Sequence, residues 1–311
     1  MATSAVLSRP LVLVGPGRAG RALARSWTRA GGRLALIVAR TPSAAARAGR
    51  ELGGRGATAA GLPKRCEILV LAVPDDRIAD VARDLARRTT CRFAFHLSGA
   101  LPASVLAPFR HRGASVASLH PLRAFSADSS AAAADARGGA RWKGALVAIE
   151  GDPEAVAFGE RLAAALGAVG RRIDTASKPL YHAAATLAAG GTMALLSVAV
   201  RAAVRAGLSE ADARAALGRL ASEAAAATVM RPFVDAYTGP IARRDAQTVR
   251  AHRAAAGGAR DFLELYRILA REILATTPAR GGERRVRAIL GGAGGGKRRT
   301  RRIRRREIRR G

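Results

Sequence analysis

The sequence has few cysteines and few aromatic residues. Its 311 residues include two cysteines, and aromatic side chains make up 4% of the chain. Cys66 and Cys91 form no CxxC pair and have no histidine cluster beside them, which argues against a metal site and against a disulfide framework. We therefore expect no metal, a location in the reducing cytoplasm, and a core built from Ala, Leu and Val.

Acidic residues are also scarce, so the chain is strongly basic. Lys and Arg number 53 against 23 Asp and Glu, a formal net charge of +30, and lysine occurs at only four positions. Residues 297–311 hold ten basic residues and one acidic residue, and the rest of the chain still holds 43 basic and 22 acidic side chains. Such a body suits anionic ligands, including phosphorylated cofactors and carboxylate substrates.

The N-terminus lacks a basic region ahead of its first apolar run, which argues against a signal peptide. Residues 183–200 carry no charge, but most of them are Ala, Gly, Thr and Ser, which insert weakly into a bilayer. We expect this segment to be a helix buried between subunits or domains, and we expect no membrane association.

Short apolar runs alternate with amphipathic segments in the first half of the chain. The patterns predict helices at 19–31, 43–52 and 78–88, and strands at 11–15, 34–40, 67–73, 93–99, 115–121 and 145–151. This alternation predicts an α/β fold in which residues 1–150 form a Rossmann domain with a doubly wound parallel sheet.

The second half has a helical pattern almost throughout. Apolar spacing predicts helices at 153–166, 178–206, 209–230, 245–256 and 258–275. We therefore predict an all-helical domain at 151–276. Residues 126–141 have the composition of a linker, and residues 277–311 are predicted to be a disordered Arg-rich tail because Gly and Arg cannot form a packed core.

A glycine-rich turn follows the first predicted strand. The sequence GPGRAG fits G-x-G-x-x-G between a strand and a helix, which is typical of a dinucleotide-binding turn. Backbone N–H groups at the start of the helix would then bind the diphosphate. The residues predicted to contact the cofactor here are Gly15, Pro16, Gly17, Arg18, Ala19 and Gly20.

The second predicted strand ends in Arg40 and Thr41, where an NAD enzyme would be expected to have an acid. A guanidinium group suits the 2′-phosphate of NADP through charge-assisted hydrogen bonds, so we predict NADP(H) as the cofactor. The alternative is that Arg40 is a solvated surface arginine in an arginine-rich chain.

Three further strand ends carry polar residues. Because ligands of this fold bind beyond the carboxyl ends of the strands, we expect Val73, Pro74, Asp75 and His96 to border the cofactor, with Ser98 and His120 as catalytic candidates. A histidine can exchange a proton near neutral pH. The alternative for either histidine is a structural, hydrogen-bonded role.

Lys178 and His182 are spaced i, i+4 at the start of the long apolar helix, so they share one helix face. We predict that this face points at a cleft, where both residues bind substrate or donate a proton. The alternative is an ordinary helix-terminal cation and a core histidine, and Tyr181 between them supplies either a hydroxyl or packing.

Several segments together resemble a bacterial family of Rossmann-like proteins with a C-terminal domain of unknown function, DUF2520. They are LVLVGPGRAGRALA, LVLAVPDDRIADVA, VAIEGDPEA, KPLYHAAATLAAGG and YTGPIARRDAQTVRAH, together with the long run from HLSGALPA to SLHPLRAF. The resemblance extends from about residue 10 to residue 273. It implies similarity to NADP-dependent reductases of the 6-phosphogluconate dehydrogenase, ketopantoate reductase and pyrroline-5-carboxylate reductase group, whose helical domain commonly mediates dimerisation.

The resemblance also implies roles for individual residues. His120 in HPL is similar to the catalytic histidine of prephenate dehydrogenases, with Ser98 as its assistant, and Lys178 with His182 resembles the Lys-x-x-x-Asn pair of β-hydroxyacid dehydrogenases. The sequence departs from the family at 189–192, which reads AGGT where relatives have an asparagine. If that asparagine contacts substrate in the relatives, this chain's substrate differs.

We therefore expect a cytoplasmic NADP-dependent oxidoreductase that moves a hydride between nicotinamide and a small anionic carbonyl or imine compound. The alternative is a non-catalytic module that senses NADP(H), because Rossmann folds host many functions. We expect a homodimer through the helical domain. The basic run at 297–310 predicts at most weak polyanion binding, because it lacks aromatic residues and a recognition helix.

Overall fold

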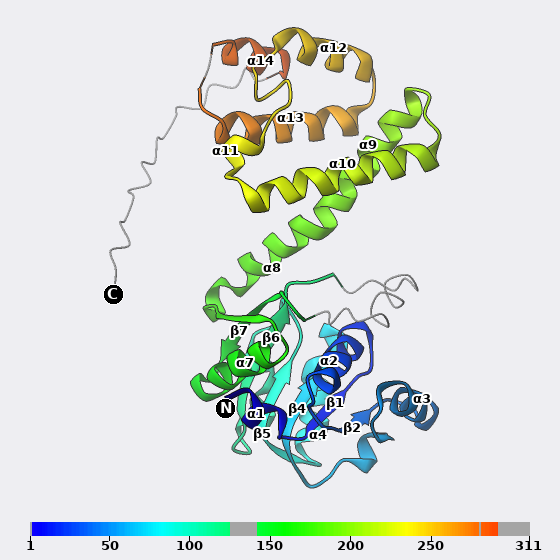
Figure 1. Cartoon of the computed structure of the whole chain (residues 1–311), viewed down its shortest axis with the longest axis vertical. Helices are drawn as coiled ribbons and strands as arrows, with labels where there is room; N and C mark the ends of the chain where they lie inside the picture. The colour runs from blue at the N-terminus through cyan, green and yellow to red at the C-terminus, as the bar shows by residue number, and fades with distance from the viewer. Residues whose placement is uncertain (1, 125–141, 280, 292–311) are drawn as a thin grey trace, which may run out of the picture. The chain divides into compact units, whose positions relative to one another are not determined.

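The computed structural model describes residues 2–124, 142–279 and 281–291 of the chain. The chain divides into two compact units, Met1–Ala189 and Gly190–Gly311. The first contains a β-sheet with helices, and the described part of the second contains helices without strands (Figure 1). The predicted class, a Rossmann-type sheet followed by a helical region, is confirmed.

An eight-stranded sheet forms the first unit, in the order β3-β2-β1-β4-β5-β6-β7-β8. Neighbouring strands are parallel except β6 and β7, which are antiparallel. The prediction of a parallel sheet therefore holds for every pair except this one. All six predicted strands are present, and β3 and β8 are short additions. The strands are β1 (Leu11–Val14), β2 (Leu34–Val38), β3 (Gly56–Ala57), β4 (Arg65–Leu71), β5 (Thr90–His96), β6 (Ser115–Pro121), β7 (Leu146–Gly151) and β8 (Val169–Arg172).

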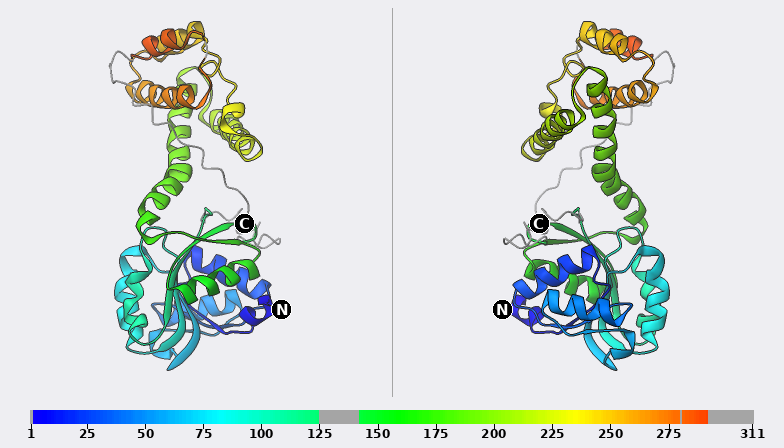
Figure 2. Two further views of the ribbon diagram at one scale, coloured as in Figure 1. Left: turned by 90° about the vertical axis from the view of Figure 1, so that its left-hand side faces the viewer. Right: turned by 90° about the vertical axis from the view of Figure 1, so that its right-hand side faces the viewer.

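Helices cover both faces of this sheet (Figure 2). On one face α2 buries Trp27 and α7 buries Phe158, and on the other α4 buries Ile78 and α5 buries Phe109. The strands between them are apolar on both faces, as strands covered on both sides must be. Up to residue 172, the helices of this unit are α1 (Ala2–Leu7), α2 (Arg18–Arg29), α3 (Pro42–Leu52), α4 (Asp75–Ala86), α5 (Ala107–Arg110) and α7 (Pro153–Ala165).

The boundary between the units falls later than the predicted residue 150. Strand β7 pairs with β6, β8 pairs with β7, and Phe158 of α7 stacks on Phe93 of β5 with ring centroids 4.2 Å apart. These contacts join residues 146–172 to the sheet. The helix expected after residue 153 is present, but periodicity alone does not show which core a helix packs against.

A long helical segment crosses the boundary. It comprises α8 (Lys178–Thr186), a π-helical turn (Leu187–Gly191) and α9 (Thr192–Arg205). Within the described residues, Thr175–Arg205 is the one helix long and apolar enough to cross a membrane by length and composition, and none of its most apolar window is buried. Among the described residues, no side chain of 183–200 is buried, and the expected burial between subunits or domains stays a prediction.

The second unit continues with five more helices in its described part, namely α10 (Glu210–Met230), α11 (Phe233–Ala236), α12 (Ala246–Ala256), α13 (Arg260–Thr276) and α14 (Glu283–Ile289). Its core cluster draws on α12, α13 and α14, with Val249 and Val286 fully buried. The prediction of disorder from residue 277 is therefore wrong for residues 281–291. Arg244 explains part of this order, because its buried guanidinium donates to Thr277 and lies 3.6 Å from Glu283.

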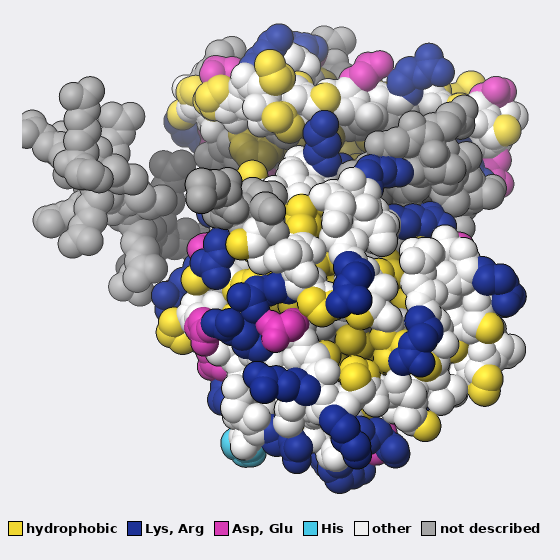
Figure 3. Space-filling view, turned by 60° about the horizontal axis from the view of Figure 1, so that its bottom comes forward, with side chains coloured by type: hydrophobic (Ala, Val, Ile, Leu, Met, Phe, Trp, Pro, Cys, Tyr) yellow, Lys and Arg dark blue, Asp and Glu magenta, His cyan; other side chains and the backbone are white. Residues whose placement is uncertain are grey.

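The predicted linker at 126–141 and the arginine run at 297–310 lie outside the described residues. On the face shown in Figure 3, Lys and Arg side chains are scattered between hydrophobic and uncharged side chains and are not gathered into one stripe.

Candidate active site

The glycine-rich turn lies between β1 and α2 and can form only with glycine at two positions. Gly15 has a φ of +90°, and a Cβ there would lie 2.7 Å from the carbonyl oxygen of Ala72 at the end of β4. A Cβ at Gly20 would lie 2.3 Å from the carbonyl oxygen of Gly15. The turn is therefore pressed against β4 and against its own helix, as a dinucleotide-binding turn requires.

The outer part of the turn is accessible. Gly17 and Arg18 are exposed, and Arg21 holds the turn by donating from Nε to the carbonyl oxygen of Pro16 at 2.8 Å. The first turn of α2 leaves backbone N–H groups without intrahelical partners. With Ala19 between its glycines, the turn offers these N–H groups to an anion, so the residues present fit a bound diphosphate.

Arg40 and Thr41 follow the carboxyl end of β2, next to the carboxyl end of β1 where the glycine-rich turn begins. Arg40 is exposed and has no hydrogen-bond or ion-pair partner within the described part of the chain. Thr41 caps α3, because its hydroxyl oxygen accepts a hydrogen bond from the backbone N–H of Ala44 at 3.2 Å. Arg40 is thus free for a ligand, whereas Thr41 already has a structural role.

Asp75 and Ser98 bring the next two strand ends together. Asp75 begins α4 after Val73 and Pro74, and the Ser98 hydroxyl donates to its Oδ2 at 2.7 Å. The same hydroxyl oxygen accepts from the backbone N–H groups of Ala100 and Leu101. Ser98 therefore shapes the loop after β5 and ties it to α4, and its hydroxyl has little capacity left for catalysis.

His96 holds the start of the same loop. Its Nε2 donates to the carbonyl oxygen of Pro102 at 3.2 Å, and its Nδ1 accepts from the backbone N–H of Ser98 at 3.2 Å. The ring is fully buried, and burial, followed by the charge of Lys178, lowers the pKa of His96 to about 3. With both nitrogens bonded and the ring buried, His96 has a structural role in this loop, and its predicted position beside the cofactor stays a prediction.

His120 has one ring nitrogen available. At the end of β6 its Nδ1 lies 2.9 Å from the hydroxyl oxygen of Tyr181, and its ring centroid lies 5.9 Å from that of His182. Burial, followed by the charges of His182 and Lys178, lowers the pKa of His120 to about 4. His120 is therefore neutral at physiological pH, with Nε2 left for a substrate.

Gly99 connects this histidine pair to the loop after β5. A Cβ at Gly99 would lie 2.5 Å from Nδ1 of His182 and 2.8 Å from Nε2 of His120. The missing side chain therefore lets the loop backbone approach both imidazoles. In this way the loop fixed by Ser98 and His96 forms one wall beside the two rings.

Lys178 has a different position from the predicted one. It is 1% exposed, and its ammonium group donates to the Ser118 hydroxyl and lies 3.5 Å from Oε1 of Glu150. Burial lowers the pKa of Lys178, and the carboxylate of Glu150 opposes that shift. Lys178 and His182 share one helix face as predicted, but the Lys178 end of that face packs against β6 and β7 instead of facing a cleft.

Glu150 and Tyr181 are the two site residues that the sequence reasoning missed or left undecided. Glu150 is 2% exposed and accepts from the Ala103 backbone N–H at 2.6 Å and from the Thr175 hydroxyl at 3.0 Å. The sequence did contain a signal for Glu150, because an acid in the apolar strand segment VAIEG needs a buried partner for its charge. Tyr181 gave no local signal, because its partner His120 is 61 residues away.

The comparisons with known proteins agree with this architecture. Residues 4–121 match the Rossmann-like domain family, and residues 145–273 match DUF2520, a domain of unknown function. The chain therefore contains one segment that matches each of these two family models. This confirms the resemblance inferred from the motifs. The DUF2520 match begins within the sheet, so it includes β7, α7 and β8 as well as α8 to α12 and most of α13.

Three solved structures share the fold. A Bacteroides fragilis protein provisionally described as an NADP oxidoreductase is 20% identical, with a TM-score of 0.67 over 86% of this chain and 98% of its own. A Thermotoga maritima protein is 24% identical, with a TM-score of 0.68 over 86% and 97%. A 1-pyrroline-5-carboxylate reductase from Streptococcus pyogenes is 13% identical, with a TM-score of 0.59 over 91% and 99%. No curated protein matches the sequence.

Proposed function

We propose that the protein is a nicotinamide-dependent oxidoreductase acting on a small carbonyl or imine compound. One observation carries the proposal: a continuous set of close approaches joins the glycine-rich turn to the histidine pair. Gly15 lies against Val73, Asp75 two residues later binds Ser98, and Gly99 lies against His120 and His182. A cofactor seated on the turn would therefore have its reactive end near the imidazoles. The similar structures described as an NADP oxidoreductase and a pyrroline-5-carboxylate reductase support the same reaction class.

The cofactor we propose is NADP(H). The amide groups at Gly17 and the start of α2 would hold the diphosphate, and the unpaired guanidinium of Arg40 would hold the 2′-phosphate. When bound, the nicotinamide supplies or accepts the hydride. The rest of the chemistry, namely orienting the substrate and moving its proton, belongs to the residues of this chain.

His120 would move the proton, and its contact with Tyr181 suits both reaction directions. If the Tyr181 hydroxyl donates to Nδ1, the neutral ring carries its proton on Nε2 and can donate a hydrogen bond to a carbonyl or imine. If Nδ1 donates instead, Nε2 is a base for an alcohol or amine. Lys178 is committed to Glu150 and Ser118, so a substrate carboxylate would have to be bound by other cations.

Calorimetric titration with NADPH and NADH tests the cofactor. We expect tighter binding of NADPH, and we expect Arg40→Ser to weaken NADPH binding about 10- to 100-fold without changing NADH binding, because one charge-assisted contact is lost. Arg50→Ser, an exposed position at the far end of α3, is the control. Equal or tighter binding of NADH would remove the role of Arg40, and no binding of either would remove the proposed function.

Turnover on a panel of carbonyl and imine compounds tests His120. We expect His120→Ala to lower turnover by about 10²- to 10⁴-fold and to leave NADPH affinity unchanged, because the ring acts on the substrate's proton. Retained turnover would end this assignment. NADPH binding by the unaltered chain without turnover on any compound would favour the sensing function instead.

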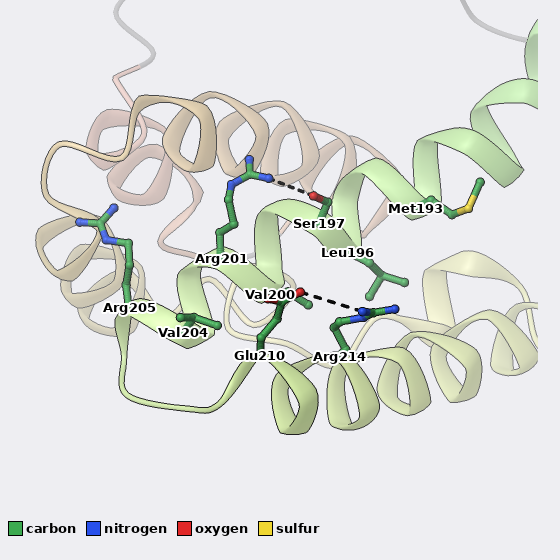
Figure 4. A pocket seen from close by; sticks show the side chains of 9 residues that line it. All are labelled: Met193, Leu196, Ser197, Val200, Arg201, Val204, Arg205, Glu210 and Arg214. Atoms are coloured by element: carbon green, nitrogen blue, oxygen red, sulfur yellow. Dashed lines mark hydrogen bonds and ion pairs between the residues drawn. The ribbon is translucent and has the colours of Figure 1, made fainter.

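We also propose that the protein is a homodimer formed through α9 and α10. Met193 and Met230 are 67% and 81% exposed, and a groove of about 690 Å³ lies between the two helices (Figure 4). Exposed apolar surface of this kind is typical of an interface. Two of the three arginines that line the groove pair with acids, Arg214 with Glu210 and Arg201 with Asp261. Such ion pairs suit a second protein surface better than a lipid core. The cytoplasmic location stays a prediction.

A further inference from the structure

The two cysteines, although 25 positions apart in the sequence, are direct neighbours in the sheet. Cys66 is the second residue of β4 and Cys91 is the second residue of β5, and the parallel register pairs them. Neighbouring strands lie about 4.8 Å apart. A disulfide requires Cα atoms about 4.4–6.8 Å apart. The register therefore sets the two backbones at a spacing that an S–S bond can bridge.

The side chains also point in the same direction. Cys91 belongs to the core cluster on the α4 face of the sheet, and Cys66 packs against that cluster. The two side chains therefore lie on the same face of the sheet, at paired positions of neighbouring strands. Both are free thiols in this structure.

The surroundings give the two thiols different reactivity. Cys66 is half-buried, and its interaction with the neighbouring Cys91 thiol lowers the pKa of its own thiol. Cys91 is 5% exposed, and the same contact, together with burial, raises the pKa of its thiol. Cys66 is thus the group that an oxidant can reach as a thiolate, and Cys91 is positioned to react with it afterwards.

We propose that Cys66 and Cys91 form a reversible disulfide when the folded chain meets hydrogen peroxide. The Cys66 thiolate attacks one peroxide oxygen, which gives a sulfenic acid at Cys66 and releases hydroxide. The Cys91 sulfur then attacks the Cys66 sulfur, forms the S–S bond and releases water. In total, both thiols lose their hydrogen atoms, and one peroxide molecule is reduced to two molecules of water.

The disulfide would form away from the candidate active site. Cys66 and Cys91 lie near the starts of β4 and β5, whereas Leu71 and His96 end those strands at the edge that carries the site. We therefore expect oxidation to leave cofactor binding unchanged. The inference depends on the register and burial of the two cysteines and not on the active site, so it and the proposed function can fail independently.

The experiment uses the reduced full-length chain. It is treated with equimolar hydrogen peroxide under native conditions, alkylated, and digested with trypsin without reductant. Arginines at 65, 77, 88 and 92 place Cys66 on the peptide 66–77 and Cys91 on the peptide 89–92. We expect a species containing both peptides with a mass lower by two hydrogen atoms. Dithiothreitol should return both cysteines to alkylatable form.

Two single variants show whether the cysteines react as a pair. In Cys91→Ala we expect oxidation to stop at a sulfenic acid on Cys66, which dimedone traps, whereas dimedone should trap little in the unaltered chain. In Cys66→Ala we expect the buried Cys91 to be oxidised at least ten-fold more slowly than Cys66. Dimedone labelling that is equal in the unaltered chain and in Cys91→Ala would overturn the proposal. Disulfides that link two chains, or no linked peptide at all, would also overturn it.

Discussion

The three histidines near the site differ in how many ring nitrogens are already bonded. Both nitrogens of His96 have partners, one nitrogen of His120 does, and Nδ1 of His182 is buried without a hydrogen-bond partner among the described residues. A ring with both nitrogens satisfied is structural, and a ring with a free nitrogen can act on a ligand. This difference, and not residue type, distinguishes the catalytic candidate from the structural histidine.

The low pKa of His96 gives a prediction for stability. The unfolded chain protonates this ring near the ordinary value of 6.5, but the folded chain does so only at about 3. The contribution of the neutral His96 ring to the free energy of unfolding is therefore complete above about pH 6.5 and is lost as the pH falls below that value. Between pH 7 and 5 the loss from this one ring is about 2 kcal/mol. We expect urea unfolding of His96→Asn to show a smaller decrease over this range.

His111→Asn provides the matched control, because His111 is exposed. Its unfolding free energy should change with pH as that of the unaltered chain does. If His96→Asn and the unaltered chain lost the same free energy between pH 7 and 5, His96 would be protonated in the folded state, and its assigned bonds to Ser98 and Pro102 would be wrong.

At the scale of single elements, two glycines of the turn between β1 and α2 have different roles, one in cofactor binding and the other in folding. A Cβ at Gly17 would meet only the carbonyl oxygen of Ala72, at 3.8 Å, whereas a Cβ at Gly20 would overlap the carbonyl oxygen of Gly15. We expect Gly17→Ala to leave the thermal midpoint nearly unchanged and to weaken NADPH binding at least ten-fold, because the methyl group would stand where the diphosphate approaches.

Gly20→Ala should instead lower the thermal midpoint as well as binding, because the helix must move away from the turn. Thermal melting and NADPH titration of both variants distinguish the two effects. Unchanged NADPH affinity in a folded Gly17→Ala chain would show that the cofactor does not approach this turn.

For the protein as a whole, the exposed apolar surface of α9 and α10 predicts self-association. Val229 is 83% exposed on α10, so Val229→Lys should cost the isolated chain little. We expect light scattering to show a dimer for the unaltered chain and a monomer for Val229→Lys, because a buried unpaired charge disfavours the interface. Gln247→Lys on α12 adds the same charge elsewhere and should remain dimeric. A monomeric unaltered chain would contradict the dimer.

The contribution of α14 to the second unit can be tested by truncation. The core cluster of this unit includes Val286 and Leu290, which are 0% and 8% exposed. A chain ending at residue 291 keeps both side chains and serves as the reference. A chain ending at residue 279 lacks both side chains, whose burial contributes about 1.5–3 kcal/mol each, so it should melt at a lower temperature. Equal midpoints would show that α14 does not stabilise the unit.

Local patterns in the amino-acid sequence account for the features that depend on neighbours along the chain. Six strands, the main helices and the glycine-rich turn follow from apolar periodicity and from glycine spacing, because each is a local pattern with a local geometric cause. The candidate positions at the strand ends follow as well, because parallel strands bring their carboxyl ends to one edge. Residues 15, 40, 98 and 120 can therefore be proposed as candidates from the sequence alone.

The role of each of those residues depends instead on long-range packing. The fold pairs His120 with Tyr181 and Lys178 with Glu150, encloses His96, and places Cys66 beside Cys91. These contacts join residues that are distant in the sequence, and helix or strand periodicity specifies which face a side chain occupies but not what meets that face. Burial and partners then set the charge of each group, so protonation and reactivity depend on the packed fold.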